Sequence, residues 1–114
     1  MPEAWLVMTA TDSEDEARRL ARALVAGRLA ACVQRLPVAS AYEWQGELRE
    51  EAEILLLIKT TGDRFPALEA WIRRNHSYQV PEVLAVPAEA WSADYLEWMK
   101  AMTRGGEASG MEAS

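Results

Sequence analysis

The feature that most restricts the fold of this chain is a pair of long extended segments joined by a short turn. Residues Ala30 to Trp44 are predicted to form one strand, which Pro37 interrupts. Gln45-Gly46 is typical of a two-residue hairpin turn, and the return strand is expected from Leu48 to Thr60. The sequence therefore predicts a long antiparallel β-hairpin.

The two strands of this hairpin are predicted to occupy different positions in the sheet. The return strand ends in the unbroken apolar run Ile54–Ile58, which favours a central strand covered on both faces. Proline cannot donate a hydrogen bond to its neighbour, so Pro37 places the first strand at an edge or marks a bulge.

The hairpin is also too long for a compact domain of this size. Fifteen strand residues at ~3.3 Å each reach roughly 50 Å, whereas a domain of about 100 residues is only roughly 33 Å across. The end that carries Tyr42 and Trp44 should therefore overhang the core. Exposed aromatic rings on a free edge favour pairing with another chain, and the alternative is a hairpin that folds back on itself.

A strand and a helix are predicted before the hairpin. Trp5–Ala10 is an apolar run typical of a strand buried on both faces. Ser13 and Glu16 have the spacing of a capping box, and Gly27 is placed to follow the helix as its C′ residue. One face of that helix carries the apolar residues Ala17, Leu20, Ala21, Leu24 and Val25.

Two further helices and a short strand are predicted after the hairpin. Asp63 is expected to cap a helix that has Pro66 in its first turn, and Ser92 to cap the last helix. The strand Val83–Val86 lies between two prolines, which suits a sheet edge. The apolar residues of the two helices are Phe65, Leu68, Trp71 and Ile72, then Tyr95, Trp98, Met99 and Met102.

This order of elements predicts an α+β fold, a ferredoxin-like split βαβ sandwich. Its antiparallel sheet has the order 4-1-3-2, with helices on one side and an additional C-terminal helix. We expect a single domain over residues 1–103 and a disordered tail over 104–114, which is small, polar and glycine-containing.

Composition excludes several classes of function. The net charge of −6 over 114 residues argues against binding to nucleic acid or to an anionic membrane. An RNA-recognition module of this topology would need a basic sheet with stacking aromatics, but the expected central strands are aliphatic. Cys32 is the single cysteine, no membrane span is recognisable, and we predict a cytoplasmic protein.

The segment His76–Glu82 gathers polar groups on a connection between two elements, where binding sites are often built. It holds the single histidine, a tyrosine and a carboxylate. A well-packed connection without a function is the alternative.

With these residues in view, the chain resembles the CutA divalent-ion tolerance family from about Trp5 to Met102. The resemblance rests on five motifs in order: Leu29-Ala30-Ala31-Cys32-Val33, Ser40-x-Tyr42-x-Trp44-x-Gly46, Glu53 with Lys59-Thr60, His76-x-Tyr78-x-x-Pro81-Glu82, and Asp94-Tyr95-x-x-Trp98. It implies a non-enzymatic homotrimer assembled through β-hairpins and linked to copper or other divalent metals. It also implies an architecture like that of PII-type signalling trimers, which is an analogy only.

The resemblance also implies candidate metal ligands. Copper ligands proposed in some members, a first-strand cysteine and a histidine pair, correspond here to Met8, Asn75 and His76. Thioether and imidazole bind Cu(I), although a thiolate would bind it more strongly. Met8 as core filler and His76 as a hydrogen-bonded structural histidine are the alternatives.

A ligand cleft between subunits is the second implied site, with candidates Cys32, Trp44, Lys59, Tyr78 and Glu82. Cys32 is either a small buried hydrophobe or a reactive thiol, and Lys59 either meets a ligand or pairs with a glutamate. An enzyme that uses Lys59, His76, Tyr78 and Glu82 for acid–base chemistry is the alternative function.

Overall fold

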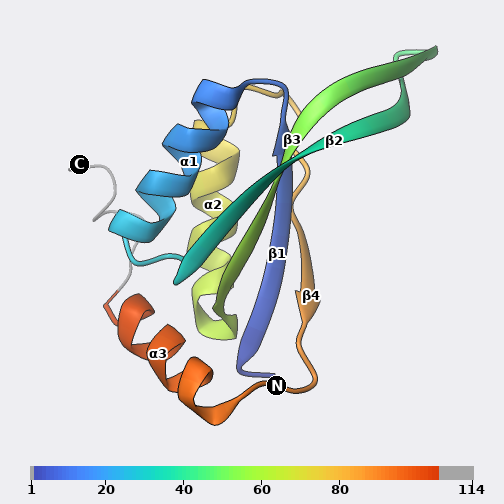
Figure 1. Cartoon of the computed structure of the whole chain (residues 1–114). Helices are drawn as coiled ribbons and strands as arrows, with labels where there is room; N and C mark the ends of the chain where they lie inside the picture. The colour runs from blue at the N-terminus through green and yellow to red at the C-terminus, as the bar shows by residue number, and fades with distance from the viewer. Residues whose placement is uncertain (1, 106–114) are drawn as a thin grey trace.

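The computed structural model describes residues 2–105 and shows one sheet with helices packed against it (Figure 1). In chain order the elements are β1 (Ala4–Thr11), α1 (Glu14–Ala26), β2 (Cys32–Trp44), β3 (Glu47–Thr61), a 3-10 turn (Gly62–Arg64), α2 (Phe65–Asn75), β4 (Leu84–Pro87) and α3 (Ala93–Thr103). Arg104 and Gly105 form a turn, and the rest of the tail predicted to be disordered lies outside the described residues.

The sheet has the order β2-β3-β1-β4, which confirms the predicted topology. All neighbouring strands are antiparallel, and β2 pairs with β3 over its whole length, from Cys32 opposite Lys59 to Trp44 opposite Glu47. Both proline-marked strands are edges, as expected, and Pro37 stays in register opposite Ile54 without a bulge. Gln45 and Gly46 turn the hairpin with φ of 52° and 82°, angles that suit its twist.

Helix α1 has the predicted apolar face, but both of its ends differ from the prediction. Ser13 caps the helix by accepting from the Glu16 N–H, whereas the Glu16 side chain does not reach back to Ser13. At the other end Gly27 is the C-cap, and Arg28 takes the left-handed conformation with φ of 61°. The Arg28 and Leu29 N–H groups then bond back into the last turn, which is the Schellman arrangement one residue later than expected.

Helix α2 begins differently from the prediction that Asp63 caps it. Asp63 lies within the 3-10 turn, and its carboxylate accepts from the Thr61 hydroxyl at 2.5 Å. The helix N-cap is Arg64, without a side-chain cap, because the 3-10 turn moves the start of the α-helix by one residue. Pro66 is in the first turn, as predicted.

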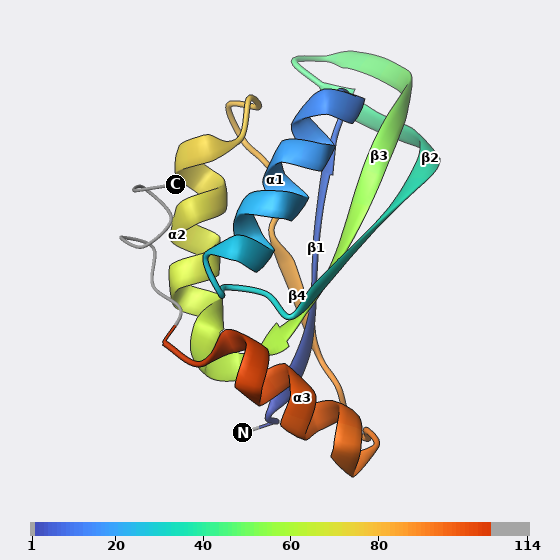
Figure 2. The same ribbon diagram turned by 60° about the vertical axis from the view of Figure 1, so that its left-hand side comes forward.

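Helices α1 and α2 lie side by side on one face of the sheet (Figure 2). The core between them is formed by fully buried residues that include Val7, Leu20, Leu56, Ile58 and Leu68. Val25, predicted to belong to this core, is 43% exposed because the apolar stripe of α1 is wider than its contact with the sheet.

Helix α3 crosses the end of the sheet where β1 begins, and its packing corrects the predicted apolar face. Leu96 and Met99 pack with Ala4 and Ala31, whereas Tyr95, Trp98 and Met102 are 38–42% exposed. Ser92 caps the helix as predicted, by accepting from the Tyr95 N–H at 3.3 Å. The exposed rings leave an aromatic surface on α3.

The second face of the sheet is largely uncovered within this chain. Successive strand residues point to opposite faces, so the residues between the core positions of β1 and β3 lie there. The predicted central strands are central, but the expected cover on both faces comes in the chain from α3 alone, at one end. We call this surface the open face; it is formed by Leu6, Met8, Leu36, Leu55, Leu57, Leu84 and Val86.

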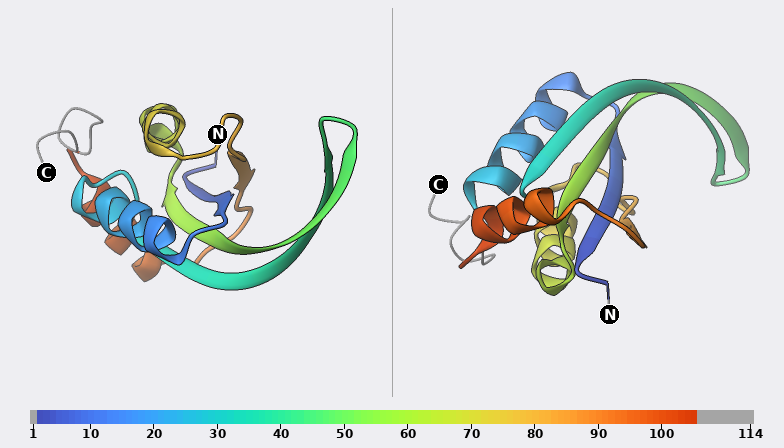
Figure 3. Two further views of the ribbon diagram at one scale, coloured as in Figure 1. Left: turned by 90° about the horizontal axis from the view of Figure 1, so that it is seen from above. Right: turned by 60° about the horizontal axis from the view of Figure 1, so that its bottom comes forward.

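The β2–β3 hairpin extends beyond β1 and curves strongly toward its tip (Figure 1, Figure 3). The molecule measures 44 Å along its longest axis with a radius of gyration of 14.4 Å. The hairpin thus projects, as predicted, and also bends, which shortens its reach below that of straight strands.

Candidate functional site

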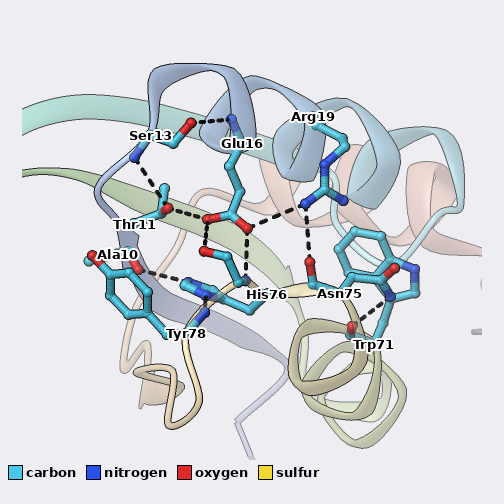
Figure 4. Close-up of polar contacts among 10 residues, drawn as sticks. Ala10, Thr11, Ser13, Glu16, Arg19, Trp71, Asn75, His76 and Tyr78 are labelled. Carbon is cyan, nitrogen blue, oxygen red and sulfur yellow. Dashed lines mark hydrogen bonds and ion pairs between the residues drawn. The ribbon is translucent and has the colours of Figure 1, made fainter.

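The loop His76–Glu82 begins where α2 ends, and a buried carboxylate from α1 holds it in place. Glu16 is 9% exposed and accepts from the Ser77 N–H and the Ser77 hydroxyl, both at 2.8 Å (Figure 4). It also accepts a very short hydrogen bond from Thr11 and lies 3.4 Å from the Arg19 guanidinium. Arg19 in turn donates to the Asn75 carbonyl at 3.1 Å, so α1 holds both the end of α2 and the start of the loop.

The pKa of Glu16 reflects two opposed influences. Burial is the largest single influence and raises the pKa, but the hydrogen bonds from Thr11 and Ser77 together outweigh it. The net pKa lies below the ordinary value of 4.5, so Glu16 is a carboxylate at neutral pH. A charged group in this position stabilises the loop because it is fully hydrogen-bonded.

Both ring nitrogens of His76 are engaged by backbone groups. Its Nδ1 accepts from the Tyr78 N–H at 3.0 Å, and its Nε2 lies 2.8 Å from the Ala10 carbonyl oxygen. The Tyr78 N–H requires a lone pair on Nδ1, and the Ala10 carbonyl oxygen requires a proton on Nε2. The ring is therefore neutral, with its proton on Nε2. The side chain is 8% exposed, and it fixes the loop onto the end of β1.

Tyr78 continues this network to the hairpin. Its hydroxyl donates to Glu53 on β3 at 2.7 Å, and its ring lies 4.8 Å from that of His76. Burial, and then the hydrogen bond to Glu53, raise the pKa of Tyr78 well above its ordinary value. Tyr78 therefore acts as a hydrogen-bond donor and is not ionised at physiological pH.

Two of the predicted cleft residues meet beside α3. Cys32 and Lys59 are opposite each other in the β2–β3 ladder, and the Lys59 Nζ lies 5.9 Å from the centroid of the Tyr95 ring. Burial, and then the neighbouring Cys32, raise the pKa of Tyr95. Cys32 is half-buried and free, and within residues 2–105 no glutamate forms an ion pair with Lys59.

Two other predicted cleft residues meet near the hairpin tip. Trp44 and Tyr78 line a cavity of about 330 Å³ together with Tyr42 and Glu51. Trp44 is twelve positions along β2 from Cys32, so one chain holds two separate half-sites rather than one cleft. Glu82 is exposed and belongs to neither group.

The predicted metal ligands do not form a metal centre within one chain. His76 has no free nitrogen, the Asn75 amide donates to the Trp71 carbonyl at 2.9 Å, and Met8 lies half-buried on the open face. Among the described residues, no three histidine, cysteine, aspartate or glutamate side chains are grouped so that they could hold a metal ion. The donor set of the single chain therefore does not fit a preorganised metal site.

Sequence reasoning missed three members of these groups. Glu16 was interpreted only as part of a capping box, because its partner Ser77 lies 61 positions away. Glu53 was noted only for its place in a motif, and Asp12 was not singled out. Only for Glu16 did the sequence contain a hint. Its carboxylate is next to the apolar face of a helix, and a carboxylate that is buried with such a face needs a partner.

Comparison with known proteins identifies the family. The model for the CutA1 divalent ion tolerance protein family matches residues 5–102. The divalent-cation tolerance protein CutA of Thermus thermophilus is 44% identical over 99 residues, which cover 86% of this chain and 96% of that protein. The structure of CutA from Synechococcus elongatus has a TM-score of 0.87 and 36% identity, and the match covers 90% of this chain and 92% of that one.

Members of the family differ in length and location. The Oryza sativa protein named CutA 1, chloroplastic, is 39% identical over 100 residues, 87% of this chain but 56% of that protein. The cytoplasmic location of the present protein therefore stays a prediction. In residues 2–105, no helix is long and apolar enough to cross a membrane. With the family model matched over nearly the whole described chain, this protein belongs to the CutA divalent-ion tolerance family.

Proposed function

We propose that the protein works as a homotrimer that binds divalent cations, copper among them, in clefts between its subunits, without catalysing a reaction. Such a trimer would act by binding or by signalling the presence of the ion. Membership of a divalent-cation tolerance family supports the cation and the non-enzymatic role. The observation that carries the assembly is the open face of the sheet.

The open face is too apolar to be left in water. Leu36, Leu84 and Val86 are 38%, 54% and 45% exposed, and they continue across the strands into Met8 and Leu57. Burying one such side chain fully contributes about 1.5–3 kcal/mol, so several together support a tight interface. Contiguous apolar surfaces of this kind mark protein–protein contacts.

The hairpin supplies the second part of the interface. Strand β2 is a thirteen-residue edge whose outer backbone groups have no strand beside them within the described chain. An edge of this length pairs readily with a strand from another chain. A hairpin that projects beyond its own core is well placed to reach a neighbouring subunit (Figure 3).

Assembly also offers a solution to the missing metal centre. One histidine whose two nitrogens are engaged cannot form a tight site alone, so a strong site must combine residues from several subunits or use the Cys32 thiol. The two half-sites of one chain, Cys32 with Lys59 and Trp44 with Tyr78, lie at opposite ends of the hairpin. A trimer would bring the hairpin end of one subunit near the strand ends of the next.

The assembly is tested by sedimentation with Leu84→Glu, which places a charge on the open face at an exposed position. The wild type should sediment as a trimer at micromolar and lower concentrations, and the variant as a folded monomer. Val25→Glu is the matched control, because Val25 is equally apolar and 43% exposed but lies on α1, on the other side of the sheet. A monomeric wild type would refute the proposal.

The cation site is tested by isothermal titration of wild type, His76→Ala and Cys32→Ala with Cu(II), and with Cu(I) under anaerobic conditions. Weak Cu(II) binding and modest Cu(I) binding are expected, since Met8 stands where some family members have the cysteine proposed as a copper ligand. Loss of binding only in Cys32→Ala assigns the site to β2, and loss only in His76→Ala assigns it to the loop. Unchanged binding in both variants would exclude these two residues.

A further inference from the structure

The cavity near the hairpin tip is lined by three aromatic rings, those of Tyr42, Trp44 and Tyr78. Its lining residues come from just after β1, from β2 and β3 near the hairpin tip, and from the loop that follows α2. Tyr42 and Trp44 are 36% and 37% exposed, so their rings remain accessible in the chain. The cavity volume of about 330 Å³ is enough for a small organic molecule.

Carboxylates surround these rings. Asp12 and Glu51 line the cavity, and Glu53 lies behind the Tyr78 hydroxyl that donates to it. Arg49 is the one cationic residue of the lining, and it stands 3.9 Å from Glu51. Three carboxylates against one guanidinium leave an excess of two negative charges at this place.

The pKa values of the Tyr42 and Tyr78 hydroxyls reflect this negative charge. Tyr42 donates to Glu51 at 2.7 Å, and this bond is the largest cause that raises the pKa of Tyr42. Asp12, Glu53 and Tyr42 all add to the raised pKa of Tyr78. The cavity thus has a negative potential in addition to its aromatic walls, and it disfavours an anionic ligand.

A bare metal ion does not fit this arrangement. Within the described residues, no three acidic, histidine or cysteine side chains are grouped to hold a metal. A metal ion needs several oxygen or nitrogen atoms around one point. An organic ammonium or guanidinium ion has no such need, and it is attracted by the faces of aromatic rings as well as by carboxylates.

We propose that the cavity formed by Tyr42, Trp44, Tyr78, Asp12 and Glu51 binds a small organic cation that carries N–H groups, an alkylammonium or alkylguanidinium. Its alkyl part contacts the rings, and its N–H groups donate to Glu51 and to Asp12, whose carboxylate has no partner among the described residues. This inference goes beyond the proposed function, because it names an organic ligand for a cavity that a single chain already forms. It requires neither the trimer nor a bound metal.

The test is a titration of uniformly ¹⁵N-labelled protein with n-butylammonium and with butylguanidinium, followed through the Trp44 indole N–H resonance. Trp44→Leu assigns that resonance among those of the five tryptophans. Butan-1-ol is the neutral probe of the same shape, and butyrate is the anionic one. We expect saturable shifts with both cations and binding at least about tenfold weaker with the two other probes.

Two matched pairs of variants, measured by isothermal titration, separate the site from general effects. Trp44→Leu and Glu51→Gln should each weaken cation binding about tenfold. Trp91→Leu and Glu50→Gln should leave it unchanged, because Trp91 is a similarly exposed ring outside the cavity and Glu50 points to the other face of β3. Thermal melts confirm that each variant is folded.

Three outcomes would overturn the inference. Equal binding of butanol would show an apolar pocket without charge selectivity. Cu(II) that shifts Trp44 and is lost in Glu51→Gln, with no ammonium binding, would make the cavity a metal site. Absence of any binding in a confirmed trimer would show that the assembly closes the cavity. The sedimentation and copper titrations above decide the proposed function separately.

Discussion

Replacing Glu16 by glutamine should release the loop that carries His76 and Tyr78. Glutamine keeps the shape of the side chain but has no charge. Its NH₂ group would replace one carboxylate oxygen and would oppose hydrogen-bond donors that this oxygen now accepts from. Glu16 accepts from one backbone N–H and two hydroxyls and contacts one guanidinium. Hydrogen bonds to a charged group contribute about 1.5–3 kcal/mol each, part of which the amide oxygen retains, so we expect a loss of about 2 kcal/mol.

The pH dependence of this loss has a defined sign. The pKa of Glu16 is lower in the folded chain than its ordinary value of 4.5, so its stabilising effect is fully present above that value. The effect decreases as the pH falls through the folded pKa. Wild type and Glu16→Gln should therefore differ by a constant amount between about pH 5 and 7 and converge in more acidic solution. Arg19 is the cationic group beside Glu16, and the ring of His76 also lies near it.

The assay is urea unfolding at matched protomer concentration, with Glu14→Gln as the control. Glu14 is in the same helical turn, but its side chain is 61% exposed and 3.5 Å from Arg35, so its removal should cost less than about 1 kcal/mol. Combining Glu16→Gln with Ser77→Ala should show a coupling of about 1 kcal/mol. Equal stability of the two glutamine variants at pH 7 would refute the role assigned to Glu16.

Three further predictions concern stability. Tyr78→Phe removes the donor to the buried Glu53 and should destabilise the protein by about 1–3 kcal/mol in urea unfolding, whereas Tyr42→Phe, at an exposed position, should destabilise it less. Arg28→Gly should be more stable than Arg28→Ala by about 1 kcal/mol in thermal melts, because φ is 61° and only glycine takes this angle without strain. The proposed trimer should resist heat, since contacts between subunits add to stability, and a melting temperature near 50 °C at micromolar concentration would contradict this.

The sequence by itself determined the elements and their order. Local signals were sufficient for this: the capping serines Ser13 and Ser92, the turn at Gln45-Gly46, and the periodicity of α1 and α2. Prolines at 37, 81 and 87 indicated the edges of the sheet, because proline has no N–H to donate to a neighbouring strand. From these signals and the family motifs the topology followed.

Only the tertiary structure decided what the polar side chains do. The left-handed residue after α1 is Arg28 and not Gly27, and the Arg28 side chain donates to the Ala101 and Met102 carbonyls of α3. The tautomer of His76 depends on Ala10, which lies 66 positions away, and the charge of Glu16 depends on Ser77. Hydrogen bonds between residues distant in sequence leave no periodic trace in it. For that reason the sequence pointed to the loop, and only the fold showed how its histidine is held.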